Sequence, residues 1–495
     1  MQLPLWIQTD KIPLIFWIKI EPAICPILCS LFNLFVTYQF VPEDLKIANI
    51  FPLYKQTNKP NEVSSYRPIS LTTSISKIFE KLILRFQRYE IWNLTIWVAP
   101  TNLVLNPVHL VTNLLVAYNT VASLQNEHQM VDVIFLDFQK AFDKVPHHIL
   151  IKKLNSIGIS SNLISWIESF LYERSQMVVI NGINSDHLPV RSGLPQGTIL
   201  APTLFCLFIK DLLDLKLHGK ICAYADDIKL FGIVTTYNSV AADLSLIEIW
   251  CGTNSMTVNV IKSGVMHFGK KNPNHNYLIG NSVIPCLSTY KDPGIIVDPT
   301  LSFTTHISAL AKKAFWCTKL LLKSIGKSNI PMIVSMFRTY VLPMLTYGIP
   351  FFFPCTISCI DKLENIQRHF TKILLRTNPH AQVSNYATRL SLLDMVPIEV
   401  IFLKISLNYL YKLVHTPSPL KYLLPPTNQS LTRSSPHSFI IPMSHLNIHK
   451  FIFPNNVLHI WNSLPDHFLS ASSPARFHQA FDVSSFLKGR ALKTL

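Results

Sequence analysis

The chain has 495 residues, of which 49% are hydrophobic and only 15% charged, and Lys and Arg exceed Asp and Glu by 16. A chain this long and apolar can bury a large core, which excludes disorder, collagen, a coiled coil and a small disulfide scaffold. The positive excess favours an acidic polymer or an anionic membrane as partner.

Two uncharged stretches raise the question of a membrane. Residues 22–40 and 339–360 are mostly apolar and long enough to span a bilayer. Both contain prolines, and core helices of a large soluble domain give the same signal, which is the interpretation we prefer. Asp10, Lys11, Lys19 and Glu21 interrupt the first apolar residues, so we expect no signal peptide.

Strand and helix patterns alternate through the first 300 residues. Runs of branched and aromatic residues predict strands at 47–54, 131–136 and 177–180, and a strand pair interrupted by two acids at 221–231. Apolar periodicity predicts helices at 76–85, 148–156 and 201–213. Gly158 is placed to end the second helix, and Asn181-Gly182 indicates a hairpin turn. The pattern predicts one mixed α/β domain.

The pattern changes near residue 300, and four regions are predicted. They are an apolar N-terminal segment (1–35), the mixed domain (36–300), a helical region (301–415), and a linker with a C-terminal extension (416–495). Residues 417–437 are rich in Pro, Ser and Thr, which is typical of a linker or long loop. For the last sixty residues we expect short strands and helices.

Three acids stand where apolar strands end. Asp137 closes the predicted strand at 131–136, and Asp226 and Asp227 are adjacent between two apolar runs. Neighbouring carboxylates in apolar surroundings raise one another's pKa unless a cation offsets them. If the strands are neighbours, the three acids converge on a site that suits two Mg²⁺ ions. The plainer alternative is that they are only turn residues.

Four segments resemble conserved motifs of one family. Residues 135–145 (FLDFQKAFDKV) look like motif A of reverse transcriptases from non-LTR retrotransposons of the LINE-type, jockey-like kind. Residues 192–202 (SGLPQGTILAP) resemble motif B, residues 224–227 (YADD) resemble motif C, and residues 65–71 (SYRPISL) are similar to the fingers motif. The similarity extends over residues 30–485 or thereabouts, and the motifs stand in the family's order.

The resemblance implies a right-hand polymerase fold. It is an α/β fold with an α+β palm, in which residues 36–300 form the fingers and palm and residues 301–415 the helical thumb or connection. A mostly helical C-terminal extension follows. The implied activity is that of an RNA-directed DNA polymerase, which extends a DNA primer on an RNA template with the help of two Mg²⁺ ions, or Mn²⁺ as a substitute.

The resemblance also implies roles for individual residues. The metal-binding and catalytic residues are Asp137, Asp226 and Asp227. The nucleotide-binding residues are Lys55, Arg67, Phe142, Gln196 and Lys262. The residues that contact template or primer are Pro195, Gly197 and Tyr224. Phe142 would reject a 2′-hydroxyl by collision, and Lys262 would protonate the pyrophosphate. For Lys55 and Lys262, a solvated surface lysine is the alternative.

Three departures from the family pattern favour an alternative function. Ala201 stands where motif B usually has Gly, and Pro293 stands where the thumb turn usually has Leu. The usual Phe-Arg segment is replaced at residues 102–109 by a stretch without arginine. The alternative is a catalytically decayed retroelement remnant that retains nucleic-acid binding only.

The expected partners and location follow from the same resemblance and from the cysteines. Partners would be an RNA template, a DNA primer or target DNA, and deoxynucleoside triphosphates, with no stable membrane partner. Nine cysteines, an odd number mostly inside apolar runs, are typical of reduced thiols. We therefore expect an intracellular protein of the nucleus or cytoplasm.

Overall fold

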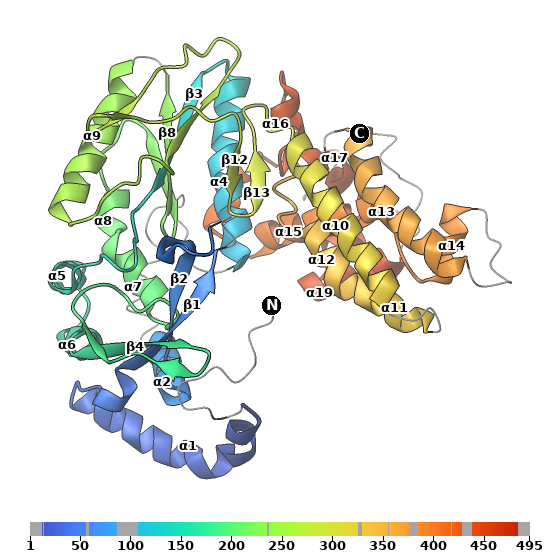
Figure 1. Cartoon of the computed structure of the whole chain (residues 1–495). Coiled ribbons are helices and arrows are strands. Elements are labelled where there is room, and N and C mark those ends of the chain that lie inside the picture. Colours follow the sequence, from blue (N-terminus) through green and yellow to red (C-terminus); the bar gives the residue numbers. More distant parts are fainter. Residues whose placement is uncertain are drawn as a thin grey trace.

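A sheet-containing part and a helical part lie side by side in the computed structural model (Figure 1). The structure describes residues 12, 14–55, 59–86, 107–234, 237–324, 329–354, 356–376, 385–416, 418–427 and 438–483. All named strands lie between residues 47 and 297. The described residues from 304 onward form helices and loops, with one isolated bridge between Thr427 and Phe439. Helices thus take the place of the short strands expected near the C-terminus.

A four-stranded antiparallel sheet, here called the palm sheet, is the centre of the first part. Its strands, in spatial order, are β7 (Lys220–Tyr224), β8 (Asp227–Ile233), β3 (Val131–Asp137) and β9 (Gly264–Phe268). The first six residues of β3 are all buried. Val133 and Phe135 belong to one hydrophobic core, and Ile134 and Leu136 to another. Because successive side chains of a strand alternate between faces, the palm sheet separates these two cores.

A second sheet, here called the finger sheet, contains both parallel and antiparallel pairs. Its strands are β2 (Tyr66–Leu71), β1 (Ile47–Tyr54), β4 (Arg174–Ile180), β5 (Ile183–Asn184) and β6 (Leu188–Val190). β1 runs parallel to β4, and the other pairs are antiparallel. Asn181 and Gly182 both have positive φ, at 51° and 83°, which a tight hairpin turn requires. The predicted hairpin is confirmed.

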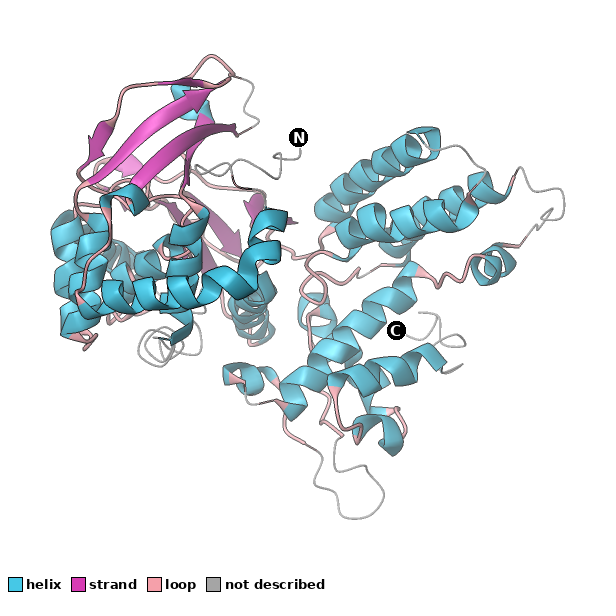
Figure 2. Ribbon diagram, turned by 90° about the horizontal axis from the view of Figure 1, so that it is seen from below, coloured by secondary structure: helices cyan, strands magenta, loops and turns pink. Residues whose placement is uncertain are grey.

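Helices cover one face of the palm sheet and form the core that contains Ile134 and Leu136 (Figure 2). They are α2 (Ser74–Phe86), α5 (His147–Ser156), α6 (Ser161–Leu171), α7 (Ala201–Phe208), α8 (Lys210–Leu213) and α9 (Tyr237–Thr253). Gly158, just after α5, has a φ of 83°, as its predicted role requires. The single helix predicted at 201–213 is wrong, because Ile209 leaves the helical conformation (ψ 3°) and separates α7 from α8.

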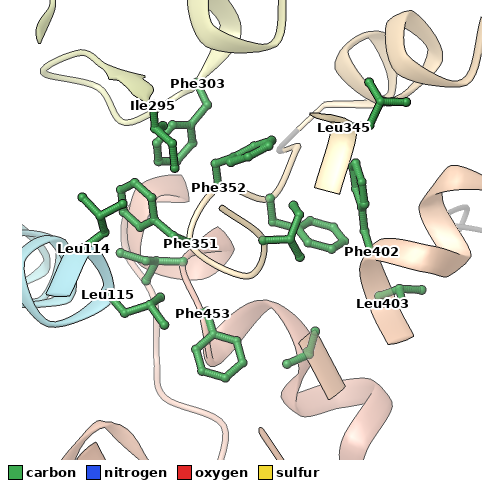
Figure 3. Packing of buried hydrophobic residues seen from close by; sticks show 14 of the residues in the cluster. Leu114, Leu115, Ile295, Phe303, Leu345, Phe351, Phe352, Phe402, Leu403 and Phe453 are labelled. Atoms are coloured by element: carbon green, nitrogen blue, oxygen red, sulfur yellow. The ribbon is translucent and has the colours of Figure 1, made fainter. Parts of the chain in front are cut away.

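The opposite face of the palm sheet shares its core with α4 (Pro107–Asn126) and with the C-terminal helices. Figure 3 shows Leu114 and Leu115 of α4 beside Phe351, in the same core as Phe352 and Phe402. These helices are α10 (Thr304–Ser324), α11 (Ile330–Met336), α12 (Leu342–Thr346), α13 (Ile357–Leu375), α14 (Tyr386–Leu392), α15 (Ile398–His415), α16 (Asn447–Phe451), α17 (Asn455–Asn462), α18 (Asp466–Leu469) and α19 (Pro474–Val483). The described residues of the second uncharged stretch, 339–360, contribute to this core, which confirms that interpretation.

The first uncharged stretch behaves differently. Its residues 22–37 belong to α1 (Leu14–Thr37), and only 11% of the apolar window of this helix is buried. Leu28 and Phe32 pack inward, and Phe32 stacks on Phe79 of α2 at 4.5 Å between ring centroids. Large apolar side chains such as Ile27 and Leu31 are exposed. Core burial is therefore the wrong explanation for this segment. Within the described residues, α1 alone has the length and composition of a membrane-crossing helix.

The predicted α/β class of fold is confirmed. An antiparallel palm sheet, a finger sheet and a large helical part are present, with mainly helical structure at the C-terminal end. This composition is what the expected right-hand polymerase fold implies. The limits of the four predicted regions stay predictions. Residues 87–106, which include most of the segment without the usual arginine, and residues 428–437 of the predicted linker lie outside the described residues.

Candidate active site

The palm sheet brings the three acids to one edge. β7 and β8 form a hairpin with Asp226 at its turn, and Ala225 takes the positive φ (53°) that this turn needs. β3 is antiparallel to β8, and Asp137 lies directly opposite Asp227 in the register. The neighbouring strands required by the sequence argument are therefore present. That these acids bind metal stays a prediction.

Burial and mutual repulsion perturb these carboxylates. Burial, and then the negative charge of Asp226, raise the pKa of Asp227 to about 6. Burial also raises the pKa of Asp137, with Asp226 adding to the rise and Lys262 opposing it. Lys262 Nζ is 3.9 Å from Asp137 Oδ2, at the edge of an ion pair, and its side chain is 65% exposed. Such a cluster favours an added cation, because a positive charge stabilises the ionised forms.

The donor set suits Mg²⁺, although the described residues contain no ready-made group of three His, Cys, Asp or Glu ligands. Mg²⁺ prefers oxygen ligands and is usually held by one or two carboxylates together with waters and substrate phosphates. A complete protein cage is therefore unnecessary. Asp137, Asp226 and Asp227 are the residues that would hold the ions.

Backbone hydrogen bonds fix the motif B loop to the segment that follows β3 and to strand β2. Leu194 N donates to Phe142 O at 2.7 Å, and Ser70 N of β2 donates to Gln196 O at 2.6 Å. Gly193 and Gly197 both have positive φ. A Cβ at Gly197 would lie 2.6 Å from Ser70 O, so glycine is needed for this close approach. Pro195 and Gln196 line a cavity of about 450 Å³ beside the finger sheet.

For Phe142, the alternative to the predicted sugar gate is a core aromatic that packs between a strand and a helix. It follows β3 and is only partly buried. Its ring stacks on Phe205 of α7, with centroids 4.7 Å apart and planes at 22°. The ring therefore has a packing partner, while its remaining surface is available to a ligand. The packing alternative and the sugar-gate role both fit this position.

The predicted triphosphate-binding cations lie near one another. Arg67 on β2 pairs with Leu53 on β1, and Lys55 follows β1 directly. Lys55 Nζ donates to Ser64 O at 2.8 Å. Burial, and then the positive charges of Lys262 and Arg67, lower the pKa of Lys55. The mutual effect of these side chains means that the fold places several cations at one site, as an anionic ligand would require.

Two of the three departures from the family pattern, Ala201 and Pro293, lie in the described residues, and both fit the local structure. Ala201 is 1% exposed at the start of α7. Pro293 and Gly294 form the turn between β12 (Tyr290–Asp292) and β13 (Ile295–Val297), and Pro293 O accepts a hydrogen bond from Tyr347. Neither residue prevents the local structure from forming.

Two residues beside the acids were missed by sequence reasoning. Burial raises the pKa of Tyr290, and the charges of Asp227, Asp292, Asp137 and Asp226 raise it further, so its hydroxyl lies close to the cluster. Lys229 is fully buried on β8, two residues beyond Asp227. A lysine within an apolar strand was the available signal for the second residue. No sequence signal marked Tyr290.

Comparison with known proteins agrees with this site. Residues 57–290 match the family model "Reverse transcriptase (RNA-dependent DNA polymerase)". The chain thus carries a reverse transcriptase domain, and this domain includes every motif described above.

Its relatives are polymerases of mobile elements. The chain is 26% identical over 371 residues to the RNA-directed DNA polymerase from mobile element jockey of Drosophila melanogaster, covering 69% of this chain and 39% of the relative. It is 27% identical over 372 residues to the probable RNA-directed DNA polymerase from transposon X-element of the same fly, with the same coverage. The similarity of the chain is thus to polymerases of mobile elements, and the match spans about two fifths of these relatives' length.

Among solved structures, the chain is similar to apo telomerase from Candida tropicalis truncated from its C-terminal domain. The identity is 12% and the TM-score 0.37, and the match covers 54% of this chain and 57% of that one.

Proposed function

We propose that this protein is an RNA-directed DNA polymerase that extends a DNA primer on an RNA template by two-metal nucleotidyl transfer. The observation that carries the proposal is the convergence of Asp137 and Asp227 on paired strands, with Asp226 at the adjoining turn. The motif order and the similarity to jockey-type polymerases support it.

The chain's residues would divide the work between binding and proton transfer. Two Mg²⁺ ions bound by the acids would supply activation of the attacking oxygen and charge stabilisation at the leaving oxygen. The primer 3′-hydroxyl oxygen would form the new P–O bond at the α-phosphorus while the bond from that phosphorus to the bridging oxygen of pyrophosphate breaks, and the hydroxyl proton would pass to water. Lys55 and Arg67 would hold the triphosphate oxygens. Lys262, whose Nζ lies 3.9 Å from Asp137 Oδ2, would give a proton to the leaving pyrophosphate.

Primer extension tests the proposal directly. The purified chain should add deoxynucleotides to a DNA primer annealed to RNA, only with Mg²⁺ or Mn²⁺ present. Asp226→Asn should abolish extension, whereas Asp211→Asn should not, because Asp211 pairs with Lys153 away from the cluster. An Asp226→Asn protein that extends primers at the parent rate would contradict the assignment.

The decayed-remnant alternative makes a different prediction. The departures at Ala201 and Pro293 favour it. Under it, the parent chain binds an RNA–DNA duplex but adds no nucleotide at any metal concentration. Restoring Ala201→Gly and Pro293→Leu together would then be the test of decay, because regained extension identifies those substitutions as its cause.

The net charge of +16 should make nucleic-acid binding depend on salt. Each phosphate contact releases counterions, so log affinity should fall against log salt with a slope of about −0.7 to −0.9 per contact. Fluorescence anisotropy with a labelled primer–template measures this slope. Affinity that ignores salt would count against a phosphate-binding surface. We also propose that the protein acts inside the cell, in the nucleus or cytoplasm.

Sugar selectivity tests Phe142. Phe142→Ala should raise the use of ribonucleotides relative to deoxynucleotides, because space opens for the 2′-hydroxyl. Phe205→Leu, which changes the other ring of the stack, is the control for lost packing. If Phe142 is only a core aromatic, its removal costs about 3–5 kcal/mol and leaves selectivity unchanged. That result in a folded, active variant removes Phe142 from the site.

A further inference from the structure

Lys229 and Asp292 form a buried ion pair between two hairpins. Lys229 lies on β8, two residues after Asp227, so the two side chains share a face of the strand. Its Nζ is 2.8 Å from Asp292 Oδ1 on β12, and the side chains are 2% and 0% exposed. The pair thus connects the hairpin that carries the acids with the hairpin β12–β13.

Helix α4 holds both members of the pair. Tyr118 Oη donates to Asp292 Oδ2 at 2.8 Å, and Lys229 Nζ donates to Asn113 Oδ1 at 3.3 Å. Asn113 Nδ2 also donates to Ala223 O of β7 at 3.0 Å. One polar network therefore fixes β7, β8 and β12 against the same helix, immediately behind the turn that carries Asp226.

The hairpin β12–β13 forms one side of the carboxylate cluster. The ring of Tyr290 stacks on Phe135 of β3 with centroids 3.9 Å apart, two residues before Asp137. Burial raises the pKa of Tyr290, and the negative charges of Asp227, Asp292, Asp137 and Asp226 add to the rise. A shift of this hairpin would therefore move the wall next to the reacting groups.

Stability alone does not explain the pair. Removing two charges from water costs several kcal/mol per ion, and replacing a buried ion pair with well-packed apolar residues is often neutral or stabilising. An ion pair nevertheless requires a more precise relative position of its two groups than apolar contacts do. Its position between the two hairpins fits a role in alignment.

We propose that Lys229 and Asp292 are positioning residues that fix hairpin β12–β13 against the catalytic hairpin and so align the reactants with the three acids. The inference rests on the proposed polymerase function. It extends that function, because neither residue contacts the reacting atoms in the scheme above.

The test is the double variant Lys229→Met/Asp292→Leu of the full chain. The melting temperature should fall by only a few degrees, because the two buried charges are removed together while Tyr118 and Asn113 each lose one hydrogen-bond partner. The kcat of primer extension should fall by about 10–100-fold, as small misplacements do, with the KM for nucleotide within about twofold. Hydrogen exchange should become faster in residues 290–297 and stay unchanged in β9.

A matched control separates positioning from lost stability. Asp132, also fully buried, lies at the other end of β3 in a network with His267 and Tyr277. Asp132→Asn should lower the melting temperature without changing kcat or exchange in residues 290–297. Tyr118→Phe, which keeps the ring but removes one donor to Asp292, should change kcat and exchange in the same direction as the double variant and by less. It serves as the test if the double variant does not fold.

Either unchanged kcat or unchanged exchange in a folded variant overturns the inference. Unchanged kcat means that the pair does not align the reactants, and unchanged exchange means that it does not hold the hairpin. If the parent itself extends no primer, the proposed function fails instead. Faster exchange confined to residues 290–297 then still supports the positioning of the hairpin, and parent-like exchange overturns it.

Discussion

Strand β3 carries a carboxylate near each end, and the surroundings of the two carboxylates differ. Asp132 is fully buried, and protein donors surround it: His267 Nδ1 and Asn272 Nδ2 each lie 2.8 Å from Oδ1, and Tyr277 Oη lies 2.6 Å from Oδ2. Asp137, five residues on, faces two further acids and a mostly exposed lysine 3.9 Å away.

The difference distinguishes a structural carboxylate, Asp132, from one that we propose to be functional, Asp137. A buried carboxylate is tolerated when donors satisfy its oxygens, because hydrogen bonds then replace the lost hydration. At the Asp137 end, the neighbours are repulsive and the compensation is incomplete, which is the arrangement that favours an external cation. Four experiments test this contrast.

The largest effect should come from Asp137→Asn. Loss of one carboxylate from the cluster should lower the rate of nucleotide addition by a factor on the order of 10³, as the loss of a key electrostatic group does. The melting temperature should not fall, because the repulsion within the cluster decreases. Single-turnover primer extension and thermal unfolding measure the two quantities. A variant that keeps a tenth of the parent rate would contradict this assignment.

The pH dependence of the free energy of unfolding should reveal the electrostatic cost of ionising Asp227 in the cluster. Folding raises the pKa of Asp227 to about 6, so the folded state favours its protonated form. The protonated Asp227 therefore adds to the free energy of unfolding in full below pH 4, and this stabilisation is lost as the pH rises through 6. It amounts to about 2–3 kcal/mol. Urea unfolding in EDTA should show it as a difference between the parent and Asp227→Asn, which lacks the titration. Parallel curves for the two proteins would contradict it.

Asp132→Asn should have a smaller effect, and on stability only. Replacing the charged acceptor weakens three hydrogen bonds, which should lower the free energy of unfolding by about 1.5–3 kcal/mol. Chemical denaturation measures the loss. The folded enzyme should extend primers at the parent rate, and a loss of activity comparable to that of Asp137→Asn would erase the contrast between the two ends.

Lys262→Met should have the smallest effect on stability. The lysine is 65% exposed and only 3.9 Å from its partner, and such surface pairs contribute less than about 1 kcal/mol. Lys270→Met, another exposed lysine, is the matched control. Urea unfolding of both variants should give similar free energies. A loss above about 2 kcal/mol specific to Lys262 would mean that this cation is a fixed part of the fold, like the donors around Asp132.

The sequence predicted three strands of the palm sheet, β3, β7 and β8, and the place of the acids at their ends, because both are local signals. The branched run before Asp137 and the acid pair at Asp226 and Asp227 specify strand ends by composition alone. Strand β9 was not predicted, and the pairing of β3 with β8 was only a condition of the metal-site argument, because pairing joins segments about 90 residues apart.

Contacts between distant segments could not be predicted in this way. Nothing near Lys229 identifies Asp292, 63 residues later, as its partner. The exposure of α1 was missed because an apolar helix has the same composition whether its neighbours cover it or not. The break at Ile209 was missed because the residues on both sides of it favour helix.

The separation of two cores by the palm sheet has a consequence for shortened copies of this chain. Val133 and Phe135 of β3 belong to the same core as Phe351, Phe402 and other residues of the C-terminal helices. A premature stop codon after residue 300 would preserve all four motifs and remove the C-terminal helices from this core, leaving α4 as its remaining helix. Such a gene would encode all of the proposed catalytic residues, and yet we expect its product to expose apolar surface and to aggregate.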